Sequence, residues 1–363
     1  MFLENLHITH FRNYISGKIS CSPNLNCITG LNGMGKTSIL EAIFYLCMGR
    51  SHAFASDNQI VKEGENFFRL DSNWKKNGQA FHIVSKVPIK KKKVLEINGT
   101  PVIRLADHIG NFPVVMITPE ETLLATEGSE VRRKYIDATL SQVNRLYLNN
   151  LIAYNKILDQ RNALLKQNNP AELHNLLEVY DIQLVRYGSV IHNERKKFLN
   201  ELLVLFQPIY EAISGRVESA SLKYVSKLIE NDYESILKES KQRDIYLQRT
   251  NVGIHKDDLD FGINGRPLKK FASQGQLKSF VLALKIAQFE YLMQEKGIAP
   301  LLLLDDIFDR LDQKRISFLL DKIVTYPETQ IFITDTDSNR TLQLLKDHHI
   351  DYKHFVIENG TIN

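Results

Sequence analysis

Short apolar runs along the first 29 residues predict three β-strands: Phe2 to Ile8, Asn13 to Ser20 and Asn24 to Thr29. The third run leads into a glycine-rich loop. After that loop, Lys36 to Met48 carries apolar residues at helical spacing, and Gly49 supplies a helix stop. The N-terminal pattern is therefore strand, glycine loop, helix.

Residues 66–118 also have the pattern of short strands. Asn77-Gly78 and Asn98-Gly99 are turn signals, and the first of them separates two apolar runs. Pro119 ends the last run. The predicted strands are Phe67 to Trp74, Ala80 to Val87, Val94 to Ile97 and Val114 to Thr118.

From residue 120 to residue 248 the apolar spacing becomes mainly helical. We expect long helices over Val143 to Lys166 and Ala171 to Phe206, separated by the polar run from Gln167 to Pro170. Gly188 could interrupt the second helix. This insert can form a helical lobe, but it is too short for the long coiled-coil arms of chromosome-organising ATPases.

From Phe261 the chain returns to alternating strands and helices. Gln274 to Glu295 has one continuous apolar face, and Leu301 to Leu304 is a fully apolar run typical of a central parallel strand. The remaining predictions are helices over Gln313 to Val324 and Leu342 to Lys346, and strands over Gln330 to Thr334 and Lys353 to Ile357.

Composition adds modest limits. Hydrophobic residues make up 43% and charged residues 24% of the chain, which is ordinary for a globular protein, and no apolar run approaches the roughly 18 residues of a membrane helix. The start has no signal-peptide pattern. Cys21, Cys27 and Cys47 lack metal-ligand spacing, so we expect reduced thiols in a cytoplasmic protein. Without a membrane helix we also expect no membrane partner.

The glycine loop carries the first chemical signal. Gly30-Leu31-Asn32-Gly33-Met34-Gly35-Lys36-Thr37 fits the P-loop pattern, in which backbone N–H groups bind phosphate oxygens. Lys36 would hold the β- and γ-phosphates and Thr37 would ligate Mg²⁺. A glycine-rich turn that matches by coincidence is the alternative. The predicted nucleotide-binding residues are Gly30, Leu31, Asn32, Gly33, Met34, Gly35, Lys36, Thr37 and Ser38.

Two acids follow the leucine strand. Ligand sites in open α/β sheets lie at the carboxyl ends of strands, so Asp305 is the predicted Mg²⁺ ligand and Asp306 the residue that orients or deprotonates the attacking water. Both could instead cap the next turn. Because Asp is shorter than the Glu common at the second position, we expect slow hydrolysis. Thr334 and Asp335 follow the next strand, where a γ-phosphate sensor usually lies.

Ser273-Gln274-Gly275-Gln276 stands at the start of the amphipathic helix. Ser273 is a good helix N-cap, and a helix N-terminus is also an anion site. Since the P-loop already closes one side of the nucleotide, this segment would read the γ-phosphate held by a second subunit. Asp312, in Leu311-Asp312, would line the same interface.

Charge leaves nucleic-acid binding open. The net charge of +4 and pI near 8.7 permit it without establishing it. Lys90 to Lys93 lies in an expected hairpin, where lysines either protect a solvated edge or contact a phosphate backbone. Arg132-Arg133-Lys134 is a second basic run, at a predicted helix start.

With these motifs the chain resembles the RecF family, in the SMC-like branch of the ABC ATPases, over nearly its whole length. The block from Gln248 to Leu259, which transporter ATPases lack, is the most specific. Ala53, Ile254 and Lys256 depart from the usual Arg, Pro and Arg. The other matching segments are Leu6 to Tyr14, Pro119-Glu120-Glu121 with Arg132-Arg133 and Asp137, Phe271 to Gln276, and Leu303 to Asp312.

The resemblance implies an α/β fold: an ABC-type (P-loop) ATPase head with a mixed β-sheet lobe and an inserted, mainly helical second lobe. The expected parts are residues 1–119, 120–248 and 249–363. It implies ATP and Mg²⁺ as cofactors, an ATP-dependent homodimer and weak DNA-dependent hydrolysis. It also implies binding to duplex DNA and single-strand/double-strand junctions, and work with RecR, RecO and RecA in replication, recombinational repair and SOS induction.

Two other functions stay open at this point. The chain could be the ATPase subunit of a transporter or an anti-phage system, which stimulation by a membrane protein and not by DNA would indicate. It could also be a binding module in which the nucleotide is structural and never hydrolysed.

Overall fold

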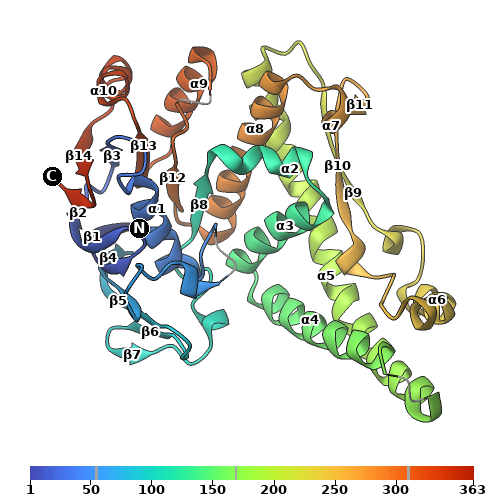
Figure 1. Ribbon diagram of the computed structural model, residues 1–363. Helices are drawn as coiled ribbons and strands as arrows, with labels where there is room; N and C mark the ends of the chain where they lie inside the picture. Colours follow the sequence, from blue (N-terminus) through green and yellow to red (C-terminus); the bar gives the residue numbers. More distant parts are fainter. Residues whose placement is uncertain (54–55, 168–169, 309–310) are drawn as a thin grey trace. The chain divides into compact units, whose positions relative to one another are not determined.

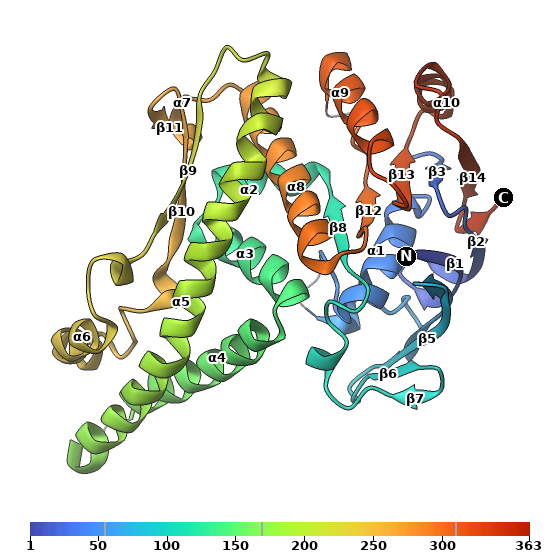
Figure 2. The ribbon, with the colours of Figure 1, turned by 180° about the vertical axis from the view of Figure 1, so that it is seen from behind.

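The computed structural model describes residues 1–53, 56–167, 170–308 and 311–363. The chain divides into two compact units. Unit 1 contains Met1–Glu121 and Leu282–Asn363, and unit 2 contains Thr122–Val281. Figures 1 and 2 show the ribbon from opposite sides.

One sheet of unit 1 is antiparallel, with strand order β2-β1-β4-β5-β6-β7. Asn77 and Gly78 have φ of 50° and 76°, and Asn98 and Gly99 have φ of 51° and 75°, as the tight two-residue turns of hairpins require. The predicted Asn-Gly turns are therefore confirmed. The strands are β1 (Phe2–Phe11), β2 (Tyr14–Ser20), β4 (Phe67–Lys76), β5 (Gln79–Pro88), β6 (Val94–Ile97) and β7 (Thr100–Pro101).

The other sheet of unit 1 has the order β15-β14-β3-β13-β12-β8 and is parallel except for β15. Every residue of β3, β8, β12 and β13 is buried, which explains why most residues of these strands are apolar. The strands are β3 (Leu25–Thr29), β8 (Val114–Ile117), β12 (Leu301–Leu304), β13 (Ile331–Asp335), β14 (Tyr352–Glu358) and β15 (Thr361–Ile362).

Helix α1 (Lys36–Met48) lies in the core that both sheets of unit 1 share, and all of its residues except Thr37 are buried (Figure 1). Its bounds agree with the prediction. Helices α9 (Gln313–Val324) and α10 (Ser338–Asp347) complete this unit, with short 3₁₀ turns η1 (Asp57–Gln59), η2 (Leu105–Asp107) and η3 (Pro119–Thr122), the last of which ends in unit 2.

Unit 2 is helical with one small sheet. Its helices are α2 (Leu123–Thr126), α3 (Ser129–Val143), α4 (Arg145–Leu165), α5 (Pro170–Ser214), α6 (Tyr233–Leu247) and α7 (Leu268–Phe271), with 3₁₀ turns η4 (Lys227–Ile229) and η5 (Ile254–Lys256). The sheet, in the order β11-β10-β9, contains β9 (Ala220–Val225), β10 (Asp258–Ile263) and β11 (Arg266–Pro267). Helix α8 (Gln274–Lys296) begins in unit 2 and ends in unit 1.

Unit 2 differs from the predicted mainly helical lobe in two ways. The stretch expected to be mainly helical also contains strand β9, and the unit extends to Val281, beyond the expected boundary at residue 248. The pairing of the two long strands of this sheet explains part of the extension. Strand β9 pairs antiparallel with β10, so residues 258–263 belong with the helical unit.

Helix α5 continues through Gly188, where the sequence had suggested an interruption, and it also contains Pro208. Packing along the helix maintains it where the local propensity is poor. In the expected break before α5, Asn168 and Asn169 lie outside the described residues.

In the described ranges, no helix combines the length and apolar character that crossing a bilayer requires. The three cysteines have free thiols, with Cys27 and Cys47 buried and Cys21 half-buried. Burial raises the pKa of Cys21 and of Cys27 to about 12.

Candidate nucleotide-binding site

The P-loop follows β3 and leads into α1, the context that the motif requires. Gly30 has φ of 152°, and a Cβ at this position would lie 2.4 Å from the carbonyl oxygen of Ile357. Only glycine fits there. Leu31, Asn32 and Gly33 are exposed, so the loop is open to a ligand from solvent.

Lys36 is buried, and its ammonium group stays within the loop. Its Nζ donates to the carbonyl oxygens of Gly30 at 2.8 Å and Leu31 at 3.2 Å. The same Nζ lies 3.9 Å from Asp306 Oδ1, with 4% of the Lys36 side chain exposed. A positive charge is therefore held between the phosphate-binding loop and the second acid of the leucine strand.

Asp305 is brought to the P-loop by the order of the strands. The Thr37 hydroxyl lies 3.0 Å from both carboxylate oxygens of Asp305, and the Thr334 hydroxyl donates to Oδ1 at 2.7 Å. Burial raises the pKa of Asp305, and the hydrogen bonds from Thr334 and Thr37 oppose that rise.

The group formed by Thr37 and Asp305 fits Mg²⁺. A hydroxyl and a carboxylate are hard oxygen ligands of the kind that this ion takes, usually together with water and substrate phosphates. A cation beside Asp305 would also offset the cost of burying its charge.

Asp306 has an unusual backbone. Its φ is 42°, in the left-handed region that a residue other than glycine rarely adopts. Its backbone N–H donates to the Thr334 hydroxyl at 2.9 Å. Thr334 thus orders both acids: it accepts from the backbone of one and donates to the carboxylate of the other. Such strain is commonly stored at functional sites.

Thr334 and Asp335 have different surroundings. Thr334 joins the acid pair, whereas the carboxylate of Asp335 accepts hydrogen bonds from Arg340 at 2.7 and 2.9 Å and from the hydroxyl of Thr341. The backbone N–H of Thr336 donates to it at 2.7 Å. The buried Asp335 is therefore engaged in the start of α10.

The segment Ser273 to Gln276 forms a capping box in unit 2. The backbone N–H of Gln276 donates to Ser273 Oγ at 3.2 Å, and that of Ser273 donates to Gln276 Oε1 at 2.7 Å. Gln276 Nε2 also donates to Glu218 at 2.7 Å. Ser273 and Gln274 are exposed and Gly275 is half-buried. The structure thus contains the predicted cap and leaves it accessible.

Asp312 is the N-cap of α9 and accepts a hydrogen bond from the backbone N–H of Arg315 at 3.0 Å. Its side chain is 54% exposed and also pairs with the Arg315 guanidinium. The residue lies on the surface of unit 1.

Sequence reasoning gave no role to the end of the segment Leu6 to Tyr14. In the structure the positive charge of Arg12 acts to lower the pKa of Asp305. The Asn13 and Tyr14 side chains donate hydrogen bonds to carbonyl groups of the P-loop. The resemblance had singled out the segment, but nothing local in it indicated contact with a loop that follows later in the chain.

The family-specific block from Gln248 to Leu259 enters a buried ionic network in unit 2. Arg195 donates to Asp257 and Asp137, both at 2.9 Å, and to the carbonyl oxygen of Ile254 at 2.7 Å. Residue 254, where this chain has Ile instead of the usual Pro, therefore joins the network through its backbone. Buried charges of this kind need full pairing, so the block maintains the fold of this unit.

The three residues of the basic run at 132–134 have different surroundings. Arg132 is buried and binds Asp258 through two nitrogens, at 2.6 and 3.0 Å, so it is not a surface contact for DNA. Arg133 donates to the carbonyl oxygen of Asp257, and Lys134 is exposed and pairs with Glu130.

The other basic run, Lys90 to Lys93, remains on the surface for most of its length. Lys90, Lys91 and Lys92 are exposed. Lys93 instead donates to Asp57 and to the carbonyl oxygen of Gly49, each at 2.8 Å.

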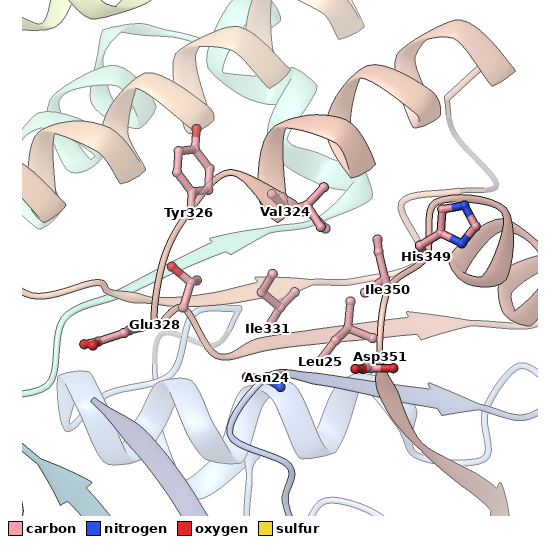
Figure 3. A pocket seen from close by; sticks show the side chains of 11 residues that line it. Asn24, Leu25, Val324, Tyr326, Glu328, Ile331, His349, Ile350 and Asp351 are labelled. Atoms are coloured by element: carbon pink, nitrogen blue, oxygen red, sulfur yellow. The ribbon is translucent and has the colours of Figure 1, made fainter.

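A pocket of about 220 Å³ lies at the amino-terminal ends of the parallel strands (Figure 3). Leu25 and Ile331, the first residues of β3 and β13, line it together with Tyr326 and Ile350. Ligand sites in open α/β sheets lie at the carboxyl ends of strands, which here carry the P-loop and Asp305. This pocket is therefore separate from the nucleotide site.

Comparisons with known proteins identify the family. The model of the RecF/RecN/SMC N-terminal domain matches residues 2–355. The DNA replication and repair protein RecF of Flavobacterium johnsoniae is 42% identical over 357 residues, covering 98% of this chain and 99% of that protein. The chain belongs to the RecF family. RecF of Cytophaga hutchinsonii is 37% identical over 364 residues, covering 100% of this chain and 96% of that protein.

Solved structures agree with the RecF family assignment. A RecF–ATP structure, described as a recombination mediator of the RecFOR pathway, superposes with a TM-score of 0.90 at 30% identity, covering 100% of this chain and 97% of that one. An Smc head domain bound to part of ScpA, at 14% identity and a TM-score of 0.58, shows the same ABC ATPase fold.

Proposed function

We propose that this protein is an ATP-dependent DNA-binding protein of replication and recombinational repair, with a weak DNA-dependent ATPase activity that acts as a switch. ATP with Mg²⁺ would favour a homodimer that holds duplex or gapped DNA, and hydrolysis would release it. One observation carries the proposal: Thr37 Oγ1 lies 3.0 Å from Asp305, which unites the P-loop with the acids of the leucine strand.

Each residue of the site has a chemical task in this proposal. The loop from Gly30 to Ser38 binds the phosphates, and Lys36 supplies a positive charge beside them. Thr37 and Asp305 would hold Mg²⁺, which neutralises phosphate charge during hydrolysis. Asp306 orients the attacking water or accepts its proton.

The proposed homodimer would use the accessible start of α8. Ser273, Gln274, Gly275 and Gln276 would bind the γ-phosphate of ATP held by the second copy, with Asp312 at the same interface. The N-terminus of a helix suits an anion. Because ATP would be bound by both copies, it stabilises the dimer by mass action.

The wider role rests on the family. Relatives at 42% and 37% identity are named DNA replication and repair proteins, and a related RecF–ATP structure is assigned to the RecFOR pathway. We extend this to a cytoplasmic role in which the protein works with RecR and RecO to load RecA on single-stranded DNA and supports SOS induction.

The deciding experiment measures the mass of the purified protein by light scattering, and its retention of gapped duplex DNA, with ATP, with ADP and without nucleotide. We expect dimers and retained DNA with ATP alone. Lys36→Ala is the control, since it removes the charge beside the phosphates. Nucleotide binding by the wild type without a dimer or retained DNA would contradict the proposal.

A further inference from the structure

The P-loop imposes a requirement on its own carbonyl groups. When successive backbone N–H groups face a phosphate, the carbonyl oxygens of the same residues face away and need other donors. Lys36 Nζ donates hydrogen bonds to the carbonyl oxygens of Gly30 and Leu31. Three consecutive carbonyls later in the loop each accept from outside it: Gly33 from Asn13 Nδ2 at 3.4 Å, Met34 from the N–H of Gly360 at 3.3 Å, and Gly35 from the Tyr14 hydroxyl at 3.2 Å.

Asn13 and Tyr14 come from the turn between β1 and β2 and lie directly against the loop. A Cβ on Gly35 would lie 2.6 Å from Asn13 Nδ2 and 2.8 Å from Tyr14 Cε2. Asn13 Oδ1 also accepts from the hydroxyl of Ser38 at 2.8 Å. This turn is therefore bonded to the end of the P-loop and to the first turn of α1.

The turn between β14 and β15 approaches the loop from the C-terminal part of unit 1. Strand β14 pairs in parallel with β3, the strand that leads into the P-loop. Asn359 and Gly360 have φ of 48° and 75°, as in a type I′ turn. Both of their N–H groups reach Met34: that of Asn359 lies 3.2 Å from Sδ, and that of Gly360 lies 3.3 Å from the carbonyl oxygen.

We propose that these two turns form a carbonyl brace, consisting of Asn13, Tyr14, Asn359 and Gly360, which holds the P-loop in its phosphate-binding conformation before ATP arrives. Its members are positioning residues: they act through the loop backbone. The inference rests on the proposed function only in that the P-loop binds ATP. It gives a task to the end of the Leu6 to Tyr14 motif and to the hairpin near the C-terminus.

The first test removes one hydroxyl. Tyr14→Phe keeps the ring and deletes the hydrogen bond to Gly35, so we expect the Kd for Mg-ATP, measured by calorimetry, to rise about 3- to 10-fold, which is typical of one lost hydrogen bond. Tyr326→Phe is the matched control, because its hydroxyl donates to Glu290 at 2.8 Å, away from the loop. The control should keep the wild-type Kd.

The second test disturbs the other turn. Gly360→Val places a β-branched residue at φ of 75° and should displace the N–H that serves Met34, with a rise in Kd of about 10-fold. Gly78→Val is the matched control, since Gly78 follows an asparagine in a turn of the same kind at φ of 76°. Both variants should lower the melting temperature of the ligand-free protein, and only the first should weaken ATP binding.

A spectroscopic measurement separates positioning from general destabilisation. The ³¹P resonance of the β-phosphate of bound ADP reports its hydrogen bonds to the loop, and we expect it to shift in Tyr14→Phe and not in Tyr326→Phe. An unchanged Kd and resonance in both brace variants, with a wild type that binds ATP, would overturn the brace alone. A wild type that binds no ATP would instead contradict the proposed function.

Discussion

At the scale of single residues, the site combines strain with burial. Asp306 keeps a left-handed backbone beside Lys36, and Asp305 is buried among the hydroxyls of Thr37 and Thr334. Such arrangements cost free energy in the ligand-free protein, and the interactions with a bound phosphate and cation can offset that cost. The acid pair therefore suits a nucleotide site better than a structural cap.

Asp306→Asn tests whether the protein hydrolyses ATP. The amide cannot accept a proton from water, so we expect turnover to fall by about 100-fold or more, with little change in ATP affinity. Steady-state phosphate release with gapped DNA measures the rate. Asp347→Asn, at an exposed position of α10, is the control. Equal and negligible rates in the wild type and Asp306→Asn would favour a purely structural nucleotide.

His255 predicts a pH dependence of stability. Its Nε2 lies 3.1 Å from the carbonyl oxygen of Thr250, which can only accept, so Nε2 carries the proton and Nδ1 accepts from the Tyr154 hydroxyl at 2.8 Å. Burial lowers the pKa of His255 to about 4. Between pH 6.5 and 4 the unfolded chain then binds a proton that the folded one does not.

Stability should therefore be level above about pH 6.5 and fall by up to about 3 kcal/mol as the pH approaches 4. Urea unfolding followed by circular dichroism at several pH values measures this loss. His255→Gln, which keeps an uncharged donor and acceptor, should lose less over the same range. Parallel curves for the two proteins would rule out His255 as the cause.

At the scale of elements, long-range packing decides where helices continue. Helix α5 passes through Gly188, which has poor helix propensity, because the aromatic rings of Tyr233 and Tyr154 lie against it. A Cβ there would lie 2.5 Å from Tyr233 Cε1. The glycine in this helix is a packing residue.

Gly188→Ala should destabilise unit 2 by about 1–2 kcal/mol, because the clash with Tyr233 outweighs the gain of about 1 kcal/mol in helix propensity. Thermal unfolding followed by circular dichroism measures the change. Ser189→Ala, at the next position of α5, is the control and should be neutral or slightly stabilising. A more stable Gly188→Ala would show that Tyr233 moves aside at no cost.

At the scale of the whole molecule, the two halves of the proposed ATP sandwich lie in different compact units: the P-loop in unit 1 and Ser273 in unit 2. In the proposed sandwich, each bound ATP would contact the P-loop of one copy and Ser273 of the other. On this proposal, assembly would be the step that ATP controls.

Ser273→Arg tests this assembly. A bulky cation in place of the exposed serine should block dimerisation, reducing the dimer fraction with ATP at least about 10-fold, and leave ATP binding to the monomer unchanged. Light scattering and calorimetry measure the two effects. Ser235→Arg, near the start of α6, is the control. Normal ATP-dependent dimers in Ser273→Arg would refute the sandwich.

The sequence by itself determined the elements whose signals are local. The P-loop, the bounds of α1 and α9 and the strand Leu301–Leu304 agree with prediction, because glycine spacing, helical periodicity and unbroken apolar runs are properties of neighbouring residues. The capping role of Ser273 could be predicted in the same way. The family could be identified from motifs that are each local.

Only the tertiary structure decided which distant residues meet. It paired β9 with β10 and so extended unit 2 to Val281, buried Arg132 against Asp258, and engaged Asp335 with α10. It also brought Asn13, Tyr14 and Gly360 to consecutive carbonyls of the P-loop. These contacts join residues far apart in the chain, and their geometry arises from strand order and close packing, which no local pattern records.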